Sequence, residues 1–200
     1  NATKTANSKI TRKCSMCGKT TTSPLYTPKT VTLSAASYTY DGKVKKPSVT
    51  VKDSKGNKIG SQYYTVSYPS GRKNVGKYTV KVTFKGNYIG SKSATFAIKP
   101  KGTSVAKVTA AKKGFKVTWK KQATQTTGYE VQYSTASNFK KGNKTVTVSK
   151  NKTTSKSVSK LSAKKKYYVR VRTYKTVKVN GKNVKLYSGW SKAKSVTTKK

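Results

Sequence analysis

Apolar and polar side chains alternate residue by residue in the second half of the chain. Two such runs follow one another between residues 114 and 134, with the apolar members Phe115, Val117 and Trp119, then Tyr129, Val131 and Tyr133. Because successive side chains of a strand point to opposite faces, each run predicts a strand with one apolar and one polar face. We expect the two strands to be neighbours in an antiparallel sheet and to share a core.

A third run places apolar residues on one face and arginines on the other. Its inward members are Tyr167, Val169, Val171 and Thr173, and Arg170 and Arg172 alternate with them. A tyrosine that opens a late strand resembles the tyrosine corner of β-sandwiches. Five landmarks in order resemble a fibronectin type III domain: Trp119, Tyr129, Leu161, Tyr167 and the Ser-Gly-Trp-Ser segment 188–191. The resemblance covers roughly residues 101–199 and implies a β-sandwich, a fold that hosts many unrelated functions.

Residues 29–99 contain a second set of strand patterns. We predict strands at residues 30–33, 44–52, 63–68, 77–84 and 93–98. Asp41 with Gly42, and Asp53 with Gly56, are typical of turns, because Gly tolerates a positive φ and Asp bonds its own backbone. We therefore interpret both acids as turn formers. Phrases such as Tyr-Tyr-Thr-Val-Ser-Tyr and Gly-Asn-Tyr-Ile-Gly-Ser resemble bacterial immunoglobulin-like repeats of secreted Firmicutes proteins.

These patterns predict an all-β protein with two tandem antiparallel β-sandwich domains after a short Cys-containing N-terminal segment. The segment spans residues 1–28, the immunoglobulin-like domain residues 29–99, and the fibronectin type III domain residues 100–200. A proline-containing linker at residues 99–102 separates the two domains, since proline favours an extended connection and lacks a backbone donor.

The N-terminal segment is the least structured part by pattern and carries Cys14 and Cys17. A single Cys-x-x-Cys pair is at best half of a zinc knuckle, because structural zinc takes four ligands. We expect no metal site. Two interpretations stay open: a small cysteine module truncated at its N-terminus, or a short-loop disulfide. The motif also resembles short cysteine repeats of clostridial surface proteins, which favours truncation.

The charge of the chain is strongly one-sided. It has 46 Lys and Arg against three acids, a formal net charge of +43, and only four of the basic residues are Arg. Such a surface attracts polyanions. Specific readers of nucleic acids favour Arg, whose planar fork binds phosphates and bases with two prongs, so specific nucleic-acid binding is disfavoured. A Lys-rich surface is better suited to diffuse, salt-sensitive attraction to teichoic acid, heparan sulfate or mucin.

The composition argues against catalysis. The chain has no His, and its three acids, Asp41, Asp53 and Glu130, are scattered, so no general base or carboxylate pair is indicated. Glu130 lies on a predicted strand, and its place in the alternation predicts that its side chain points towards solvent. No phosphate-binding loop, cofactor motif or apolar run long enough to span a membrane occurs. We predict a non-enzymatic protein without a cofactor.

Asn180-Gly181 between two strand-forming arms predicts a β-hairpin that extends the sandwich as a ribbon. It carries Lys175, Lys178, Lys182 and Lys185, and by resemblance to type III domains this loop is the candidate contact site. A solvated hairpin without a partner is the alternative. Arg170 and Arg172 are further candidates on the outer face of the adjoining strand, beside Tyr168 and Tyr174. Base stacking on that face is possible in principle, but a solvated sheet face explains the pattern more simply.

We therefore expect a secreted or cell-surface adhesion protein of a Gram-positive gut bacterium, which binds anionic cell-wall or host surfaces. Alternatively, the chain resembles irisin-like fibronectin type III polypeptides. It would then be a proteolytically released ligand for a host receptor, such as an integrin of the αV group.

Overall fold

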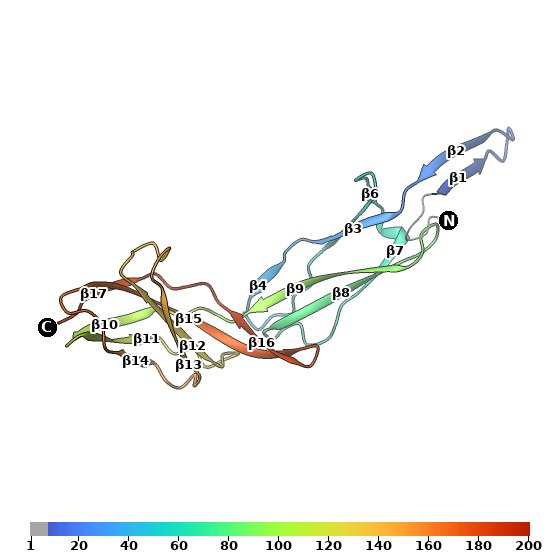
Figure 1. The fold of residues 1–200 in the computed structure, drawn as a ribbon. Helices are drawn as coiled ribbons and strands as arrows, with labels where there is room; N and C mark the ends of the chain where they lie inside the picture. Colours follow the sequence, from blue (N-terminus) through green and yellow to red (C-terminus); the bar gives the residue numbers. More distant parts are fainter. Residues whose placement is uncertain (1–7) are drawn as a thin grey trace. The chain divides into compact units, whose positions relative to one another are not determined.

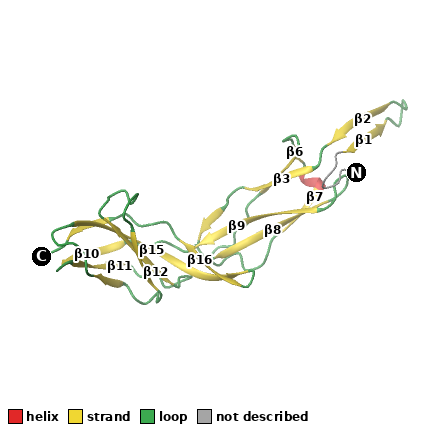
Figure 2. Cartoon of the chain, in the orientation of Figure 1, coloured by secondary structure: helices red, strands yellow, loops and turns green. Residues whose placement is uncertain are grey.

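A computed structural model describes residues 8–200 as an all-β chain with sandwich-type sheets (Figure 1). Its contacts define two compact units. One comprises the described residues up to Tyr38 with Val44–Arg72 and Lys77–Ala97, and the other comprises Thr39–Lys43, Lys73–Gly76 and Ile98–Lys200. Among the described residues the only helical turn is a short 3-10 helix, η1, at Ser61–Tyr63 (Figure 2). The predicted fold class is confirmed.

The N-terminal segment forms a hairpin, contrary to the expectation of little structure there. Strands β1 (Ser8–Lys13) and β2 (Thr20–Leu25) pair antiparallel, from Ser8 opposite Leu25 to Lys13 opposite Thr20. The pattern was hard to read because the strands carry mostly exposed Thr, Lys and Ser. The base of the hairpin is anchored instead by buried Leu25 and by Ile10, which pack on the core of the following sheets.

Two sheets follow in the N-terminal half of the chain. One has the strand order β3-β5-β6 and the other β4-β9-β8-β7. The bounds are β3 Pro28–Leu33, β4 Ser37–Thr39, β5 Val49–Asp53, β6 Lys58–Ile59, β7 Tyr64–Ser67, β8 Gly76–Phe84 and β9 Ser91–Lys99. Buried Val51, Ile59, Tyr64, Val82 and Phe84 belong to one core cluster.

The five strands predicted for residues 29–99 all occur, and two short ones, β4 and β6, were missed. The predicted strand at residues 44–52 begins only at Val49. Pro47 precedes it and has no N–H for a ladder bond, and its carbonyl accepts a hydrogen bond of 2.6 Å from the Tyr68 hydroxyl. The loop is thus held by a side chain, which the alternation of residues does not reveal.

Both aspartates act as turn formers, as predicted. One carboxylate oxygen of Asp53 accepts hydrogen bonds from the backbone N–H groups of Lys55 (2.8 Å) and Asn57 (2.9 Å). An oxygen of Asp41 accepts one from the N–H of Lys43 at 2.9 Å. These carboxylates satisfy backbone donors that a tight turn would otherwise leave unpaired.

The C-terminal half also has two sheets. One has the order β10-β11-β14, and the other has the order β13-β12-β15-β16 with β17 also paired to β15. The bounds are β10 Val105–Ala111, β11 Gly114–Trp119, β12 Gly128–Ser134, β13 Lys144–Val148, β14 Ser155–Val158, β15 Lys166–Val179, β16 Lys182–Tyr187 and β17 Lys194–Thr197.

The two leading strand patterns of the sequence, now β11 and β12, belong to different sheets, so the expectation that they pair in one sheet is wrong. Their apolar faces nevertheless share one core. The rings of Phe115 and Tyr133 meet edge to face at 5.6 Å, and those of Trp119 and Tyr129 lie 5.2 Å apart. Alternation identifies the buried face of a strand, but it does not specify which strand lies beside it in the sheet.

The predicted ribbon is confirmed. β15 runs for 14 residues and pairs with β16 from Tyr174 opposite Tyr187 to Val179 opposite Lys182. Asn180 and Gly181 close the hairpin with φ of 50° and 77°. Two successive residues with positive φ form the tight turn that matches the twist of the strands, which explains why Asn-Gly predicted it.

Candidate functional site

The four ribbon lysines do not share one face. Paired residues of an antiparallel ladder lie on the same face, and neighbours along a strand on opposite faces. Lys178 and Lys185 therefore lie on one side of the ribbon, opposite Asn183 and Thr176. Lys175 and Lys182 lie on the other, opposite Leu186 and Val179. The ribbon thus presents two pairs of cations rather than one cluster of four.

The lysine pairs differ in their surroundings. Lys178 is exposed, whereas the ammonium of Lys185 lies 4.7 Å from the centre of the Tyr174 ring. On the opposite side, half-buried Val177 and Val184 face each other across the ladder between Lys175 and Lys182. One side of the ribbon is therefore polar and cationic, and the other is apolar with a cation towards each end.

The other candidate residues, Arg170 and Arg172, are held in a stack of aromatic rings. The Arg170 guanidinium lies 4.0 Å from the Phe139 ring centre and 4.7 Å from that of Trp190. The Arg172 guanidinium lies 4.3 Å from Trp190 and 3.8 Å from Tyr187. Cations and rings thus alternate in the order Phe139, Arg170, Trp190, Arg172, Tyr187, which we name the arginine ladder.

One edge of each guanidinium group is also hydrogen-bonded. Nε and one terminal nitrogen of Arg170 donate to the side-chain oxygen of Gln132, at 2.8 and 2.5 Å. The same atoms of Arg172 donate to Glu130 at 3.0 and 2.7 Å. Burial, and to a lesser degree the charge of Arg172, lower the pKa of Arg170. These contacts engage one hydrogen-bonding edge of each guanidinium, while aromatic rings lie against its faces.

The alternation of residues predicted that the Glu130 side chain is exposed to solvent, and this prediction is wrong. It is only 6% exposed and forms an ion pair with Arg172. The outer face of this sheet is covered by the rings of the arginine ladder, so an outward side chain is still buried. Tyr174 lies on this outer face with the two arginines, as predicted, but its side chain is only 2% exposed.

Trp190 is positioned by the two serines that flank its segment. The Ser188 hydroxyl accepts a hydrogen bond from the Thr173 N–H, and that of Ser191 accepts one from the Val171 N–H. The backbone N–H groups of the serines donate in return to the carbonyls of Thr173 and Val171. Segment 188–191 thereby pairs with the part of β15 between its contacts with β16 and β17. Sequence reasoning singled out Ser-Gly-Trp-Ser as a fold landmark but missed its contact with the arginines.

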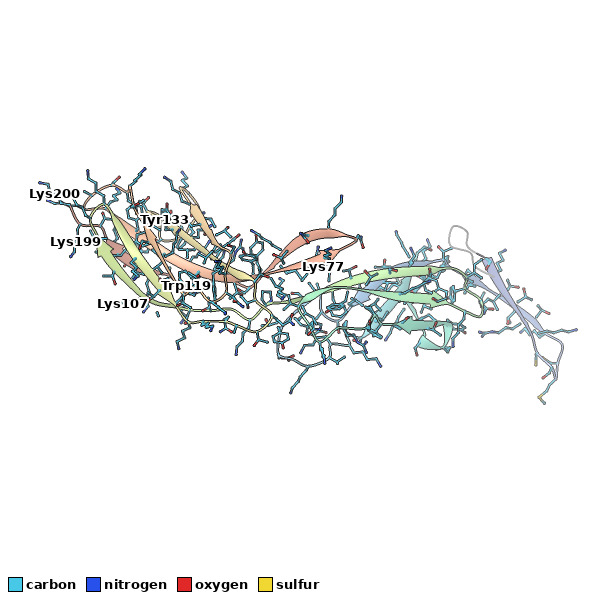
Figure 3. The ribbon with its side chains drawn as sticks, turned by 90° about the horizontal axis from the view of Figure 1, so that it is seen from below. Lys77, Lys107, Trp119, Tyr133, Lys199 and Lys200 are labelled. Atoms are coloured by element: carbon cyan, nitrogen blue, oxygen red, sulfur yellow. The ribbon has the colours of Figure 1, made fainter. Side chains whose placement is uncertain are left out.

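A second lysine-bearing surface lies on the outer face of the β10-β11-β14 sheet, and the sequence analysis did not single it out. The inward residues Phe115, Val117 and Trp119 are buried. Their outward neighbours form two cross-strand rows. One row is Lys107, Thr118 and Ser155, and the other is Thr109, Lys116 and Ser157. Figure 3 labels Lys107 of β10 and Trp119 of β11. The alternation of β11 contained this signal, because Lys116 separates two core residues.

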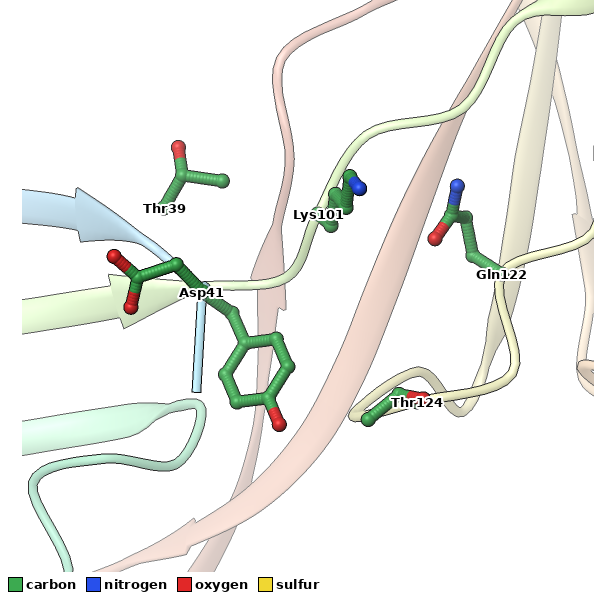
Figure 4. A pocket seen from close by; sticks show the side chains of 6 residues that line it. Thr39, Asp41, Lys101, Gln122 and Thr124 are labelled. Carbon is green, nitrogen blue, oxygen red and sulfur yellow. The ribbon is translucent and has the colours of Figure 1, made fainter. Parts of the chain in front are cut away.

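A pocket of about 450 Å³ is lined by Thr39, Tyr40, Asp41, Lys101, Gln122 and Thr124 (Figure 4). All six residues belong to the second compact unit. The one carboxylate in this lining, that of Asp41, accepts a turn hydrogen bond from the backbone of Lys43. Within residues 8–200, no three His, Cys, Asp or Glu side chains come together as metal ligands. The lining therefore contains no pair of carboxylates.

These sheets and surfaces define a class of protein built from β-sandwich modules. Residues 98–185 match the fibronectin type III domain family, and residues 29–102 match the MBG domain family. A fibronectin type III domain and an MBG domain are therefore present in this chain. No curated protein is significantly similar to it in sequence. Type III and immunoglobulin-like folds are typically non-catalytic scaffolds, and type III domains are typical of extracellular or surface proteins.

Solved structures that are similar to this chain include segments of three proteins. The FN1–FN3 domains of chicken CNTN1 are 16% identical, with a TM-score of 0.42 over 97% of this chain and 78% of that one. Domains A168–A170 of titin are 17% identical, with a TM-score of 0.37 over 92% and 72%. A two-domain type III segment of chicken tenascin is 18% identical, with a TM-score of 0.41 over 86% and 99%.

Proposed function

We propose that this chain is a non-enzymatic, secreted or cell-surface binding protein that adheres to anionic polymers through its lysines. Its partners would be teichoic acid of the cell wall, or host heparan sulfate and mucin. We keep the division into an N-terminal segment (1–28), an immunoglobulin-like domain (29–99) and a type III domain (100–200). In the described part of the chain, no helix is long and apolar enough to cross a membrane.

The observation that carries this proposal is that the three acidic side chains are few and already engaged in contacts. Asp41 and Asp53 bind the backbone of their own turns, and Glu130 is paired with Arg172. Three acidic side chains can compensate only a few of the 46 Lys and Arg side chains, so most of the positive charge is uncompensated. A surface with uncompensated cations attracts polyanions over a distance set by the ionic strength. Because the exposed cations are lysines, this attraction needs no fixed ligand geometry.

Salt dependence is the first test of this proposal. We would measure binding to immobilised heparin and to teichoic acid at about 50 and 300 mM salt, a range over which screening changes strongly. Counterions compete for each neutralised charge, so affinity should fall on the order of 100-fold if about three charges are neutralised. Affinity that hardly changes with salt would contradict the proposal.

Two matched variants distinguish diffuse from local binding. Lys178→Glu with Lys185→Glu alters the ribbon, and Lys107→Glu with Lys116→Glu alters the outer face of the β10-β11-β14 sheet. Both doubles lower the net charge equally. Diffuse attraction predicts a similar loss of heparin affinity in both. A loss confined to one double would indicate a local site on that surface.

A second candidate function is that of a ligand for a host receptor of the αV-integrin type, in the manner of an irisin-like polypeptide. The apolar side of the ribbon favours it, because Val177 and Val184 form a half-buried cross-strand pair between two lysines. Such a contact would depend on shape and should persist at about 300 mM salt. Binding to αV-integrin-bearing cells would then be lost in Val177→Ser with Val184→Ser, while heparin binding would be retained.

A further inference from the structure

Every side-chain sulfur atom of the protein lies in one loop. The chain has two cysteines and one methionine, which are Cys14, Cys17 and Met16. Both cysteines are exposed free thiols, and Met16 is 96% exposed. An exposed methionine is unusual because its side chain is apolar, and nothing in the fold requires these three groups for packing.

The loop is short and closed by the hairpin. β1 ends at Lys13 and β2 begins at Thr20, and these two residues are paired. The Cys14 N–H donates to the Lys19 carbonyl at 2.8 Å, and the Gly18 N–H donates to the Cys14 carbonyl at 3.0 Å. Gly18 has a φ of 67°, which glycine adopts without strain. These bonds hold both cysteines on one tight turn, whose strands are anchored by Leu25.

We propose that Cys14 and Cys17 together bind one Cu(I) ion as a pair of thiolates, with the Met16 thioether as an adjacent third donor. Thiolates and thioethers are soft ligands that select Cu(I) over harder cations. Binding releases the two thiol protons and transfers no electron. The resulting complex of two thiolates and one Cu(I) carries a single negative charge.

The same donors do not suit zinc within one chain. Structural zinc takes four nitrogen, thiolate or carboxylate ligands. The chain has no His, and its three acids are occupied at Asp41, Asp53 and Glu130. Zinc would therefore need two copies of the loop. The expectation of no metal site rests on this four-ligand requirement, which Cu(I) does not have.

The electrostatic surroundings suit an anionic complex. Arg12, Lys13 and Lys19 flank the loop in sequence. The Cε atom of Lys13 lies 4.0 Å from the position that a Cβ atom would take on Gly18, so this side chain lies against the turn. Nearby cations stabilise a negatively charged complex, which would be repelled by an acidic surface.

The test is a competition for Cu(I) with the full chain. The protein is reduced, its two free thiols are confirmed by alkylation and mass spectrometry, and it is titrated without oxygen into the coloured Cu(I)–bicinchoninate complex. We expect the colour to fall until one Cu(I) is bound per chain, while the protein remains a monomer by light scattering. Zn²⁺ offered with a competing chelator should not be retained by the monomer.

Three variants provide the controls. Cys17→Ser should abolish the transfer of Cu(I), Met16→Leu should weaken it if the thioether binds, and Ser15→Ala should leave it unchanged. Far-ultraviolet circular dichroism confirms that each variant is folded. The proposal is overturned if reduced wild-type protein takes no more Cu(I) than Cys17→Ser, or if one metal ion is bound per two chains with dimer formation. An unchanged Met16→Leu would overturn the role of the thioether.

Discussion

The basic residues in the two halves of strand β15 have different surroundings and different roles. In its first half, Arg170 and Arg172 lie between aromatic rings, and their nitrogens are hydrogen-bonded to Gln132 and Glu130. In its second half, Lys178 extends into solvent from the ribbon. One strand thus contains basic residues that stabilise the fold and basic residues that are available to a partner. A count of positive charges does not separate these two roles.

The difference follows from the chemistry of the side chains. A guanidinium is planar, so it stacks on rings with its face and donates hydrogen bonds from its edge at the same time. An ammonium is a compact, strongly hydrated charge and gains less from such a site. Arg72 follows the same rule, since it lies over the Tyr68 ring and donates to the Pro69 carbonyl at 2.8 Å. Arginines here are mainly structural, and lysines form the surface.

The largest expected effect comes from removing the carboxylate of Glu130. Glu130→Ala leaves Arg172, whose side chain is only 24% exposed, without its ion-pair partner. We expect the free energy of unfolding of the type III domain to fall by about 3 kcal/mol. Both tryptophans lie in this domain, so tryptophan fluorescence during urea unfolding reports on it selectively. Glu130→Gln keeps an acceptor and should cost less. A loss below about 0.5 kcal/mol would show that the pair is not structural.

Removing the central ring of the arginine ladder should have the next largest effect. Trp190→Ala deletes one ring that contacts two guanidinium groups. We expect a loss of about 2 kcal/mol, because each contact contributes on the order of 1 kcal/mol when partly desolvated. Urea unfolding, followed by the remaining Trp119, measures it. Trp190→Phe keeps a ring and should recover part of the loss. Equal losses in the two variants would mean that ring stacking is unimportant.

Alkaline pH should lower the free energy of unfolding of the type III domain by a smaller amount than these two substitutions. Burial raises the pKa of Tyr174, and burial together with a hydrogen bond to Glu130 raises that of Tyr187. The folded state therefore favours the neutral phenol. Stability from this source is complete below about pH 10, the ordinary pKa of tyrosine, and is lost as pH rises through the higher folded pKa. Urea midpoints between about pH 8 and 11 should fall less steeply in Tyr187→Phe than in the wild type. Parallel curves would contradict this assignment.

The smallest change in stability is expected at the ribbon. Lys178→Ala should alter the free energy of unfolding by less than about 0.5 kcal/mol, because its side chain is exposed. Heparin affinity at about 50 mM salt should nevertheless weaken by a few-fold, since one unscreened charge is lost. Isothermal titration and urea unfolding measure the two quantities separately. A destabilised variant would show that the ribbon lysines are also structural and would remove the contrast with the arginines.

Much of the fold follows from short-range patterns in the sequence. Alternation correctly identified the buried faces around Trp119 and Tyr129, and Asn180-Gly181 correctly predicted the ribbon. The same patterns wrongly predicted that β11 and β12 lie in one sheet. Alternation shows which face of a strand is buried, but it does not determine which strand pairs with it. The hairpin of β1 and β2 was missed for a related reason, since most of its residues are exposed and polar on both faces.

The candidate site was less predictable than the fold. The four ribbon lysines were predicted together as one candidate site, but their division between two faces depends on the register with β16. Glu130 and Arg172 are far apart in sequence and directly opposite in the sheet. Their burial depends on Trp190 and Tyr187 covering them. That cover is a tertiary contact, and no local pattern around Glu130 indicates it.

The arginine ladder also has a consequence for how freely the sequence can change. Mutations at its five residues should be strongly constrained, because each ring or cation is shared by its neighbours in the stack. Exposed lysines such as Lys107, Lys116 and Lys178 can be gained or lost singly with little effect on folding. Under the proposed function, the affinity of the surface for polyanions can therefore change in steps of one charge, while the scaffold that carries it remains the same.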